Sequence, residues 1–193
     1  MKKNFIIVAA IAAISLMSCK TEMTNPLLTE SGHRYEAPAF DKITEEHYIP
    51  AFEAAIAEGK KEIAAIVENP DAPTFENTIL ALEYAGGTLN KVAGIFYNIN
   101  EANTSDRMQE IAEQISPMMT EYSLSIMLNG ELFNRVKAVY EQRESLNLDV
   151  EEAKLLAETY KSFADNGANL SDEDKAKYSK IQEELSLATL KFG

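Results

Sequence analysis

Apolar residues recur every three or four positions along most of the chain after about residue 38, and no sustained stretch alternates apolar and polar residues. This spacing places the apolar side chains along one face of an α-helix, whereas a half-buried strand would alternate. The pattern predicts an all-α fold with about six helices. The expected helical segments are 49–66, 75–96, 105–128, 131–145, 150–165 and 172–192.

Residues that cap helices precede several of these segments. Thr74, Asp149 and Ser171 each carry a side-chain oxygen that can accept a hydrogen bond from the free backbone amides of a first turn. We expect each of the three to begin a helix. Acidic residues 172–174 follow Ser171, and we interpret them as the negative first turn of a helix rather than as a calcium loop, because the spacing lacks the glycine and the final glutamate of an EF-hand.

Three places in the pattern predict weaker or interrupted helix. Gly86 and Gly87 lie in the middle of the second segment, and each costs about 1 kcal/mol relative to alanine. Pro117 lacks an amide proton and predicts a kink in the third segment. Asn129 and Gly130 are typical of a left-handed end to that helix.

The first residues have the pattern of an export signal. Lys2 and Lys3 precede an apolar run at residues 5–16, which is too short to span a bilayer. The Leu-Met-Ser-Cys sequence that ends at Cys19 resembles the lipobox of bacterial lipoproteins, in which the cysteine is acylated. The alternative is an ordinary secretory signal followed by a free thiol.

This interpretation divides the chain into three parts: a signal peptide at 1–18, a lipidated tether at 19–37, and a helical domain at 38–193. It predicts a protein of the cell envelope, anchored to a membrane by lipid on Cys19 outside the cytoplasm, facing either the periplasm or the cell surface.

Charge and residue counts exclude several classes of function. The 31 acidic and 18 basic side chains give a net charge of −13, which does not favour a nucleic-acid partner. One cysteine permits neither an internal disulfide nor a thiolate zinc cluster. His33 and His47 are the two histidines, and their spacing does not fit a zinc site; we expect His47 to pack or cap near the first helix and His33 to be solvated.

Methionines cluster in the third segment. Met118, Met119 and Met127 could form an adaptable peptide-binding surface, but methionine at helical spacing is more often core filler, and we favour that interpretation.

Several blocks of sequence resemble the amino-terminal region of bacterial peptidyl-dipeptidases, within the thimet-oligopeptidase family of zinc metallopeptidases. The blocks are NPLL (25–28), YEAPAFDKI (35–43), HYIPAF (47–52), EIAAI (62–66), FENTILALE (75–83), LNGELF (128–133), RV (135–136) and RESL (143–146). The resemblance implies an enzyme that removes dipeptides from the carboxy end of short peptides, with zinc held in a distant carboxy-terminal catalytic domain by an H-E-x-x-H helix.

That zinc motif does not occur in the sequence. We therefore assign no catalytic and no metal-binding residue, and expect the chain alone to be inactive. The resemblance implies a missing carboxy-terminal catalytic domain as partner and a role for these helices as a wall or lid of the substrate channel.

The last predicted helix keeps an apolar stripe to the end of the sequence. Ile181, Leu185, Ala188 and Phe192 lie along it. We expect this stripe to require a partner surface outside the chain. The alternative hypothesis is a free-standing helical lipoprotein that binds a partner or a peptide without catalysis.

Overall fold

The computed structural model describes residues 24–192, with the side chains of residues 24–190. Within this part of the chain every regular element is helical, which confirms the predicted all-α fold. The longer helices are α1 (Tyr48–Val67), α3 (Gly87–Ala102), α4 (Asp106–Met127), α5 (Gly130–Glu141), α6 (Val150–Asp165) and α7 (Asp172–Phe192). The one-turn helix α2 (Ala81–Tyr84) follows a π-helical segment (Phe75–Leu80), and short 3-10 turns lie at Arg34–Glu36, Glu45–His47 and Arg143–Ser145.

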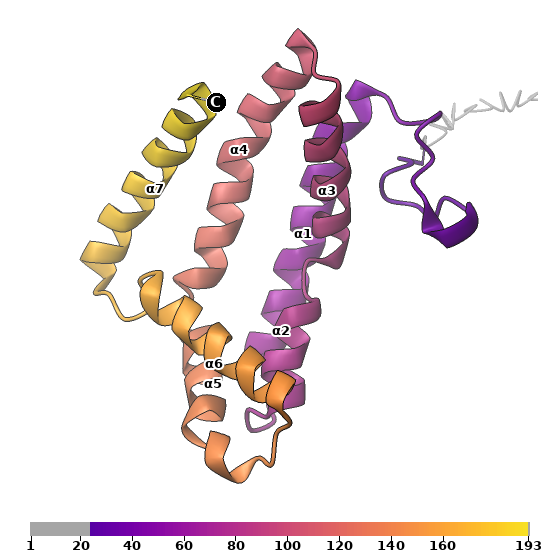
Figure 1. Cartoon of the computed structure of the whole chain (residues 1–193). Coiled ribbons are helices and arrows are strands. Elements are labelled where there is room, and N and C mark those ends of the chain that lie inside the picture. Colours follow the sequence, from indigo (N-terminus) through magenta and orange to yellow (C-terminus); the bar gives the residue numbers. More distant parts are fainter. Residues whose placement is uncertain (1–23, 193) are drawn as a thin grey trace, which may run out of the picture.

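The helices form an elongated body with α7 along one side. Helix α1 packs against α3 and α4, while α5 and α6 pack together near the other end of α1 (Figure 1). Helix α7 lies against α4, and the chain returns along α4 in the opposite direction (Figure 1).

Two apolar clusters hold this body together. The first joins the amino-terminal half of α1 to α3 and α4, and its centre is Phe96, whose ring meets those of Tyr48 and Phe52 edge-on at 5.0 and 5.7 Å. The second joins the other half of α1 to the π-helical segment, α5 and α6, and includes Leu132 and Phe163, both essentially inaccessible to solvent. Each such side chain stabilises the fold by about 1.5–3 kcal/mol.

Three of the expected caps are confirmed. Thr74 Oγ1 accepts a hydrogen bond from the Asn77 amide at 3.1 Å, and Ser171 Oγ accepts one from the Asp174 amide at 3.2 Å. Asp149 accepts two, from the amides of residues 151 and 152. Residues 172–174 form the first turn of α7, as predicted.

The predicted single helix over 75–96 is wrong, because the helix is interrupted at Gly86. This residue has a φ of 77°, in the left-handed region that favours glycine. The Glu62 carboxylate of α1 accepts a hydrogen bond from the Gly86 amide at 2.7 Å and so fixes the start of α3. The two glycines therefore end one helix and begin another instead of weakening a continuous one.

The predicted left-handed stop at Asn129 and Gly130 is also wrong. Asn129 has a φ of −72°, and its side chain accepts a hydrogen bond from the Leu132 amide at 3.0 Å. Asparagine is as good an amino-terminal cap as it is a helix end, and here it begins α5. Helix α5 ends at Glu141, before the predicted Ser145. Helix α4 continues through Pro117.

Residues of the expected tether, before Pro38, contact the packed body. Leu27 has 0% of its surface exposed and belongs to the first cluster, and Asn25 Nδ2 donates a hydrogen bond to the His47 carbonyl at 2.8 Å. One buried leucine in a turn creates no helical periodicity, so the sequence pattern could not reveal it. The predicted signal peptide and Cys19 lie outside the described residues.

Candidate functional site

Helix α7 is joined to α4 by polar side chains. Ser186 Oγ lies 2.7 Å from Ser116 Oγ and accepts a hydrogen bond from Thr120 Oγ1 at 2.9 Å. Nearer the start of α7, Lys175 Nζ donates to the Leu128 carbonyl at 3.1 Å. These contacts place the two helices antiparallel. Leu190 adds an apolar contact with the first cluster.

The apolar side of α7 faces solvent. Ile181 is 60% exposed, Leu185 54% and Leu187 42%. Ile181 and Leu185 are four residues apart and so lie on the same face of the helix. These two positions of the predicted stripe are therefore exposed in the part of the chain that the structure describes. The side chain of Phe192 lies outside the described residues.

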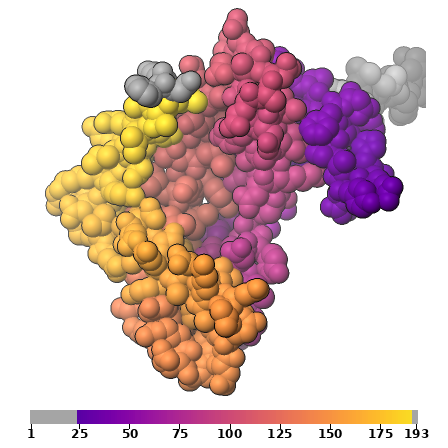
Figure 2. All heavy atoms as spheres, in the orientation of Figure 1, coloured from indigo at the N-terminus to yellow at the C-terminus, as the bar shows by residue number. Residues whose placement is uncertain are grey.

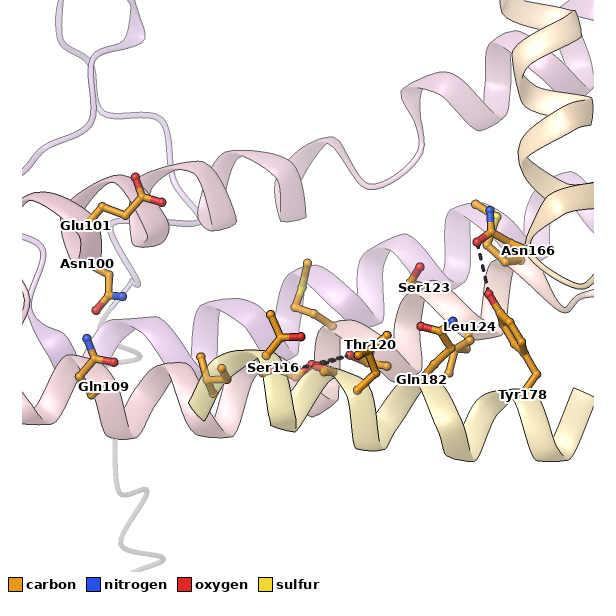
Figure 3. A pocket seen from close by; sticks show the side chains of 16 residues that line it. Asn100, Glu101, Gln109, Ser116, Thr120, Ser123, Leu124, Asn166, Tyr178 and Gln182 are labelled. Carbon is orange, nitrogen blue, oxygen red and sulfur yellow. Dashed lines mark hydrogen bonds between the residues drawn. The ribbon is translucent and has the colours of Figure 1, made fainter. Parts of the chain in front are cut away.

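A groove of about 770 Å³ runs between α7 and α4. The surface is hollowed there, and the end of α3 and the end of α6 close the two ends of the groove (Figures 2 and 3). This volume falls in the range of known ligand pockets, about 300–1,000 Å³.

The lining of the groove is uncharged apart from one acidic side chain, that of Glu101. The four amide side chains that line it are Asn100, Gln109, Asn166 and Gln182. Its apolar part is formed by Met119, Leu124, Met127, Leu185 and Leu190. Glu101 carries the charge, and no lysine, arginine or histidine of the described part of the chain lines the groove.

Several of these polar groups remain available for a ligand. Asn166 is engaged, since its Nδ2 donates to the Ser162 carbonyl and its Oδ1 accepts from the Tyr178 hydroxyl. Gln109 uses its Nε2 to donate to Thr104 Oγ1 at 2.7 Å. Gln182 and Ser123 have no hydrogen bond from their side chains to any other residue within 24–190.

The three methionines of α4 pack against the core, and two of them also line the groove. Met118 and Met119 are partly buried against the first cluster and Met127 against the second, as expected of core filler. Met119 and Met127 also line the groove. Met119 and Met127 therefore fit both interpretations, since they contact the core and also form part of a surface that a ligand could reach.

A second cavity, of about 380 Å³, lies between the two clusters beside Tyr122 and Gly86. Burial is the main cause that raises the pKa of the Tyr122 hydroxyl above its ordinary value, and the negative charge of Glu62 adds to the effect. A tyrosine with a raised pKa stays neutral at physiological pH and is a poor base. We interpret this cavity as a packing gap.

The two histidines are placed as predicted. His47 Nδ1 accepts a hydrogen bond from the Thr44 amide at 3.0 Å, which closes the turn before α1. His33 is exposed. In the part of the chain that the structure covers, no three His, Cys, Asp or Glu side chains come close enough to hold a metal ion.

The chemistry of the groove fits binding better than catalysis. Its titratable side chains are Glu101 and Tyr178, which lie at opposite ends (Figure 3). No nucleophile in it is paired with a general base, as covalent catalysis requires. The sequence analysis missed this site, because its amides come from four separate helices or helix ends and produce no local motif.

None of the helices within residues 24–192 combines the length and apolar character needed to cross a membrane.

Comparison with known proteins finds relatives among peptidases. No family model matches the chain. It is 44% identical to the dipeptidyl carboxypeptidase of Escherichia coli over 169 residues, which is 88% of this chain and 25% of that protein. It is 41% identical to the enzyme of the same name from Salmonella typhimurium over 170 residues, and 28% identical to oligopeptidase A of Haemophilus influenzae over 171 residues, again about a quarter of each relative.

These relatives support the resemblance to the amino-terminal region of thimet-oligopeptidase-family peptidases. The chain spans about a quarter of the length of the curated relatives it matches.

Proposed function

We propose that this chain is the amino-terminal helical part of a peptidase similar to dipeptidyl carboxypeptidase, an enzyme that would remove dipeptides from the carboxy end of short peptides. The observation that carries the proposal is the 44% identity over 169 residues with a protein of that name. Identity at this level over most of the chain supports a shared fold and a shared place in the enzyme.

In this proposal the chain contributes shape and binding surface, and the hydrolytic chemistry is carried elsewhere in the enzyme. Zinc is the metal that the family resemblance implies, and it would activate water for attack on the peptide bond. The residues of this chain do not fit a zinc site: its two histidines are 14 positions apart, and His47 is used to close a turn. We derive no catalytic step from them.

The helical wall would act by steric exclusion. A carboxy-terminal dipeptide can be removed only if the end of a flexible chain reaches the active site, so a wall of packed helices admits short peptides and excludes folded proteins. The exposed apolar face of α7, with Ile181 and Leu185, supports this placement because it needs a covering surface. We propose that the catalytic part of the enzyme supplies that surface.

The alternative function is a free-standing helical lipoprotein that binds a peptide or a partner. The groove along α4, which is uncharged apart from Glu101, favours it, since a binding site of this size does not require a catalytic domain.

A lipid anchor at Cys19 is part of both proposals. It is supported by the charged start, the short apolar run and the lipobox-like sequence. Mass spectrometry of the mature amino terminus should show acylated cysteine, and Cys19→Ser should leave the protein without lipid. An unmodified thiol, or cleavage at another bond, would reject the anchor.

A chimera tests the peptidase proposal. The matched region of the Escherichia coli enzyme is replaced by the corresponding region of this chain, and dipeptide release from a blocked tetrapeptide is measured with zinc present. We expect release by the chimera at a rate within about tenfold of the parent enzyme, and none by this chain alone. A folded chimera that binds zinc but releases no dipeptide would contradict the proposal, as would zinc-dependent release by the chain alone.

A further inference from the structure

We infer that the groove between α4 and α7 binds an extended peptide segment, with the free amino group of the peptide beside Glu101. The inference rests on the proposed function for its ligand class, peptides, but it concerns binding and not hydrolysis. It therefore has a test that does not measure peptide cleavage.

The charge of the groove disfavours anionic ligands. Phosphates and carboxylates are bound by arginine, lysine or helix starts, and the groove has no cationic side chain among the described residues that line it. Glu101 instead offers a site for a positive group. A free amino terminus carries such a charge at neutral pH.

The lining suits the main chain of a peptide. An extended peptide presents amide donors and carbonyl acceptors along its length, and a primary amide side chain can both donate and accept. The side chains of Gln182 and Gln109 retain free groups of this kind, and Gln182 is the more central of the two (Figure 3). Met119 and Met127 can adapt to peptide side chains of different shapes.

The length of the groove sets the length of the peptide. Its lining on α4 extends from Gln109 to Met127, which corresponds to about 27 Å at 1.5 Å per residue. An extended chain covers this distance with about eight residues. Glu101 lies at one end and Tyr178 at the other, so the amino terminus would lie at the α3 end and the peptide would leave past α6 (Figure 3).

The test measures equilibrium binding of a probe peptide to the full chain by fluorescence anisotropy. The probe is an octapeptide with a free amino terminus, no charged side chain and a dye at its carboxy end. We expect saturable binding that weakens about three- to tenfold when the amino terminus is acetylated, because the acetyl group removes the charge that Glu101 meets. Glu101→Gln should abolish this preference for the free amine, and Glu113→Gln, an exposed carboxylate on α4 outside the groove, should preserve it.

Two amide variants test the position of the site. Gln182→Ala should weaken binding about fivefold, the effect of one lost hydrogen bond. Gln114→Ala is the matched control: this glutamine is exposed on α4 outside the groove, and its amide bonds only to its own helix. Circular dichroism verifies that each variant is folded.

Absence of binding, or binding that Gln182→Ala and Gln114→Ala affect equally, would overturn the inference. Equal affinity for the free and acetylated peptides would overturn the assigned orientation. Dipeptide release by an active chimera together with no binding to the groove would reject this inference and leave the peptidase proposal intact; binding to the groove with an inactive chimera would do the reverse.

Discussion

Helices α1 and α7 have nearly the same length, 20 and 21 residues, but opposite relations to the protein. Helix α1 buries eight of its residues between α3, α4 and α5. Helix α7 buries none of its described side chains, turns Ser186 and Gln182 toward α4, and leaves Ile181 in solvent and Leu185 half-exposed at the edge of the groove. Apolar periodicity identified both as helices, but it could not say whether the surface that covers the stripe lies within the chain.

Helices α1 and α7 are also held in place by different kinds of contact. In α1 the contacts are apolar, and the interlocked aromatic rings exclude solvent. Between α7 and α4 they are mainly hydrogen bonds. The neutral bond of Ser186 contributes about 0.5–1.5 kcal/mol in net terms, and the charged one of Lys175 about 1.5–3 kcal/mol. We therefore expect α1 to control the global stability of the chain and α7 to open locally.

The largest effect on stability should come from a substitution in α1, within the apolar core. Phe52→Ala on α1 removes a ring with 0% exposure and should lower the free energy of unfolding by about 3–5 kcal/mol. Leu185→Ala on α7 should change it by less than about 0.5 kcal/mol. Urea denaturation of both variants checks the difference, and similar losses would mean that α7 belongs to the cooperative core.

A close approach within the core gives the next largest effect. A Cβ atom at Gly59 of α1 would overlap the Tyr122 hydroxyl of α4, so Gly59→Ala should cost about 1–3 kcal/mol. A Cβ atom at Gly94 in α3 would meet no other atom within 4 Å. Gly94→Ala should therefore stabilise the folded protein by about 0.5–1 kcal/mol. Adding Tyr122→Phe to Gly59→Ala should restore part of the loss; an unchanged loss would show that the hydroxyl is not the obstacle.

Alkaline pH should destabilise the folded protein through Tyr122, the residue that contacts Gly59. The raised pKa of Tyr122 means that the unfolded chain releases this proton at a lower pH than the folded chain does. The contribution of Tyr122 to stability is therefore constant below about pH 10 and is lost as the pH rises toward and through the folded pKa. Unfolding titrations between pH 9 and 11 should show a shallower fall for Tyr122→Phe than for the unaltered chain, and parallel curves would contradict this.

The smallest effect should come from the polar contact of α7. Ser186→Ala removes the acceptor of Thr120 Oγ1 and should speed amide exchange in α7 about fivefold, with little change in global unfolding. Ser179→Ala, on the same helix and without a hydrogen bond from its side chain to another residue within 24–190, is the control. Equal effects of the two substitutions would show that the hydroxyl cluster does not hold α7.

The fold was predictable where a signal is local. Thr74, Asp149 and Ser171 cap helices because of their own side chains, and the sequence shows this directly. Gly86 and Asn129 were misjudged because each residue type can serve either end of a helix. At Gly86 a distant residue fixes the break, since the partner of its amide is Glu62, 24 positions away; at Asn129 the side chain caps the following helix instead of ending the preceding one.

The candidate site was less predictable. Gln109 and Gln182 become neighbours of one groove only when α7 returns along α4, and nothing in either helix alone indicates this. Leu27 is a similar case, because it lies in a turn and its burial produces no helical periodicity in the sequence. The family resemblance was carried by blocks of sequence, and the relatives matched over 88% of the chain support it.

Hydrogen exchange of α7, measured in this chain and in the chimera with the Escherichia coli enzyme, tests most directly whether the outer face of α7 is built for contact with the rest of a peptidase. We predict that the amides after about Lys180 exchange faster than those of α1 in the chain alone and are slowed at least tenfold in the chimera, because Ile181 and Leu185 become covered. Equal protection of α7 in both proteins, at the level of α1 and independent of concentration, would contradict the account and favour the free-standing lipoprotein.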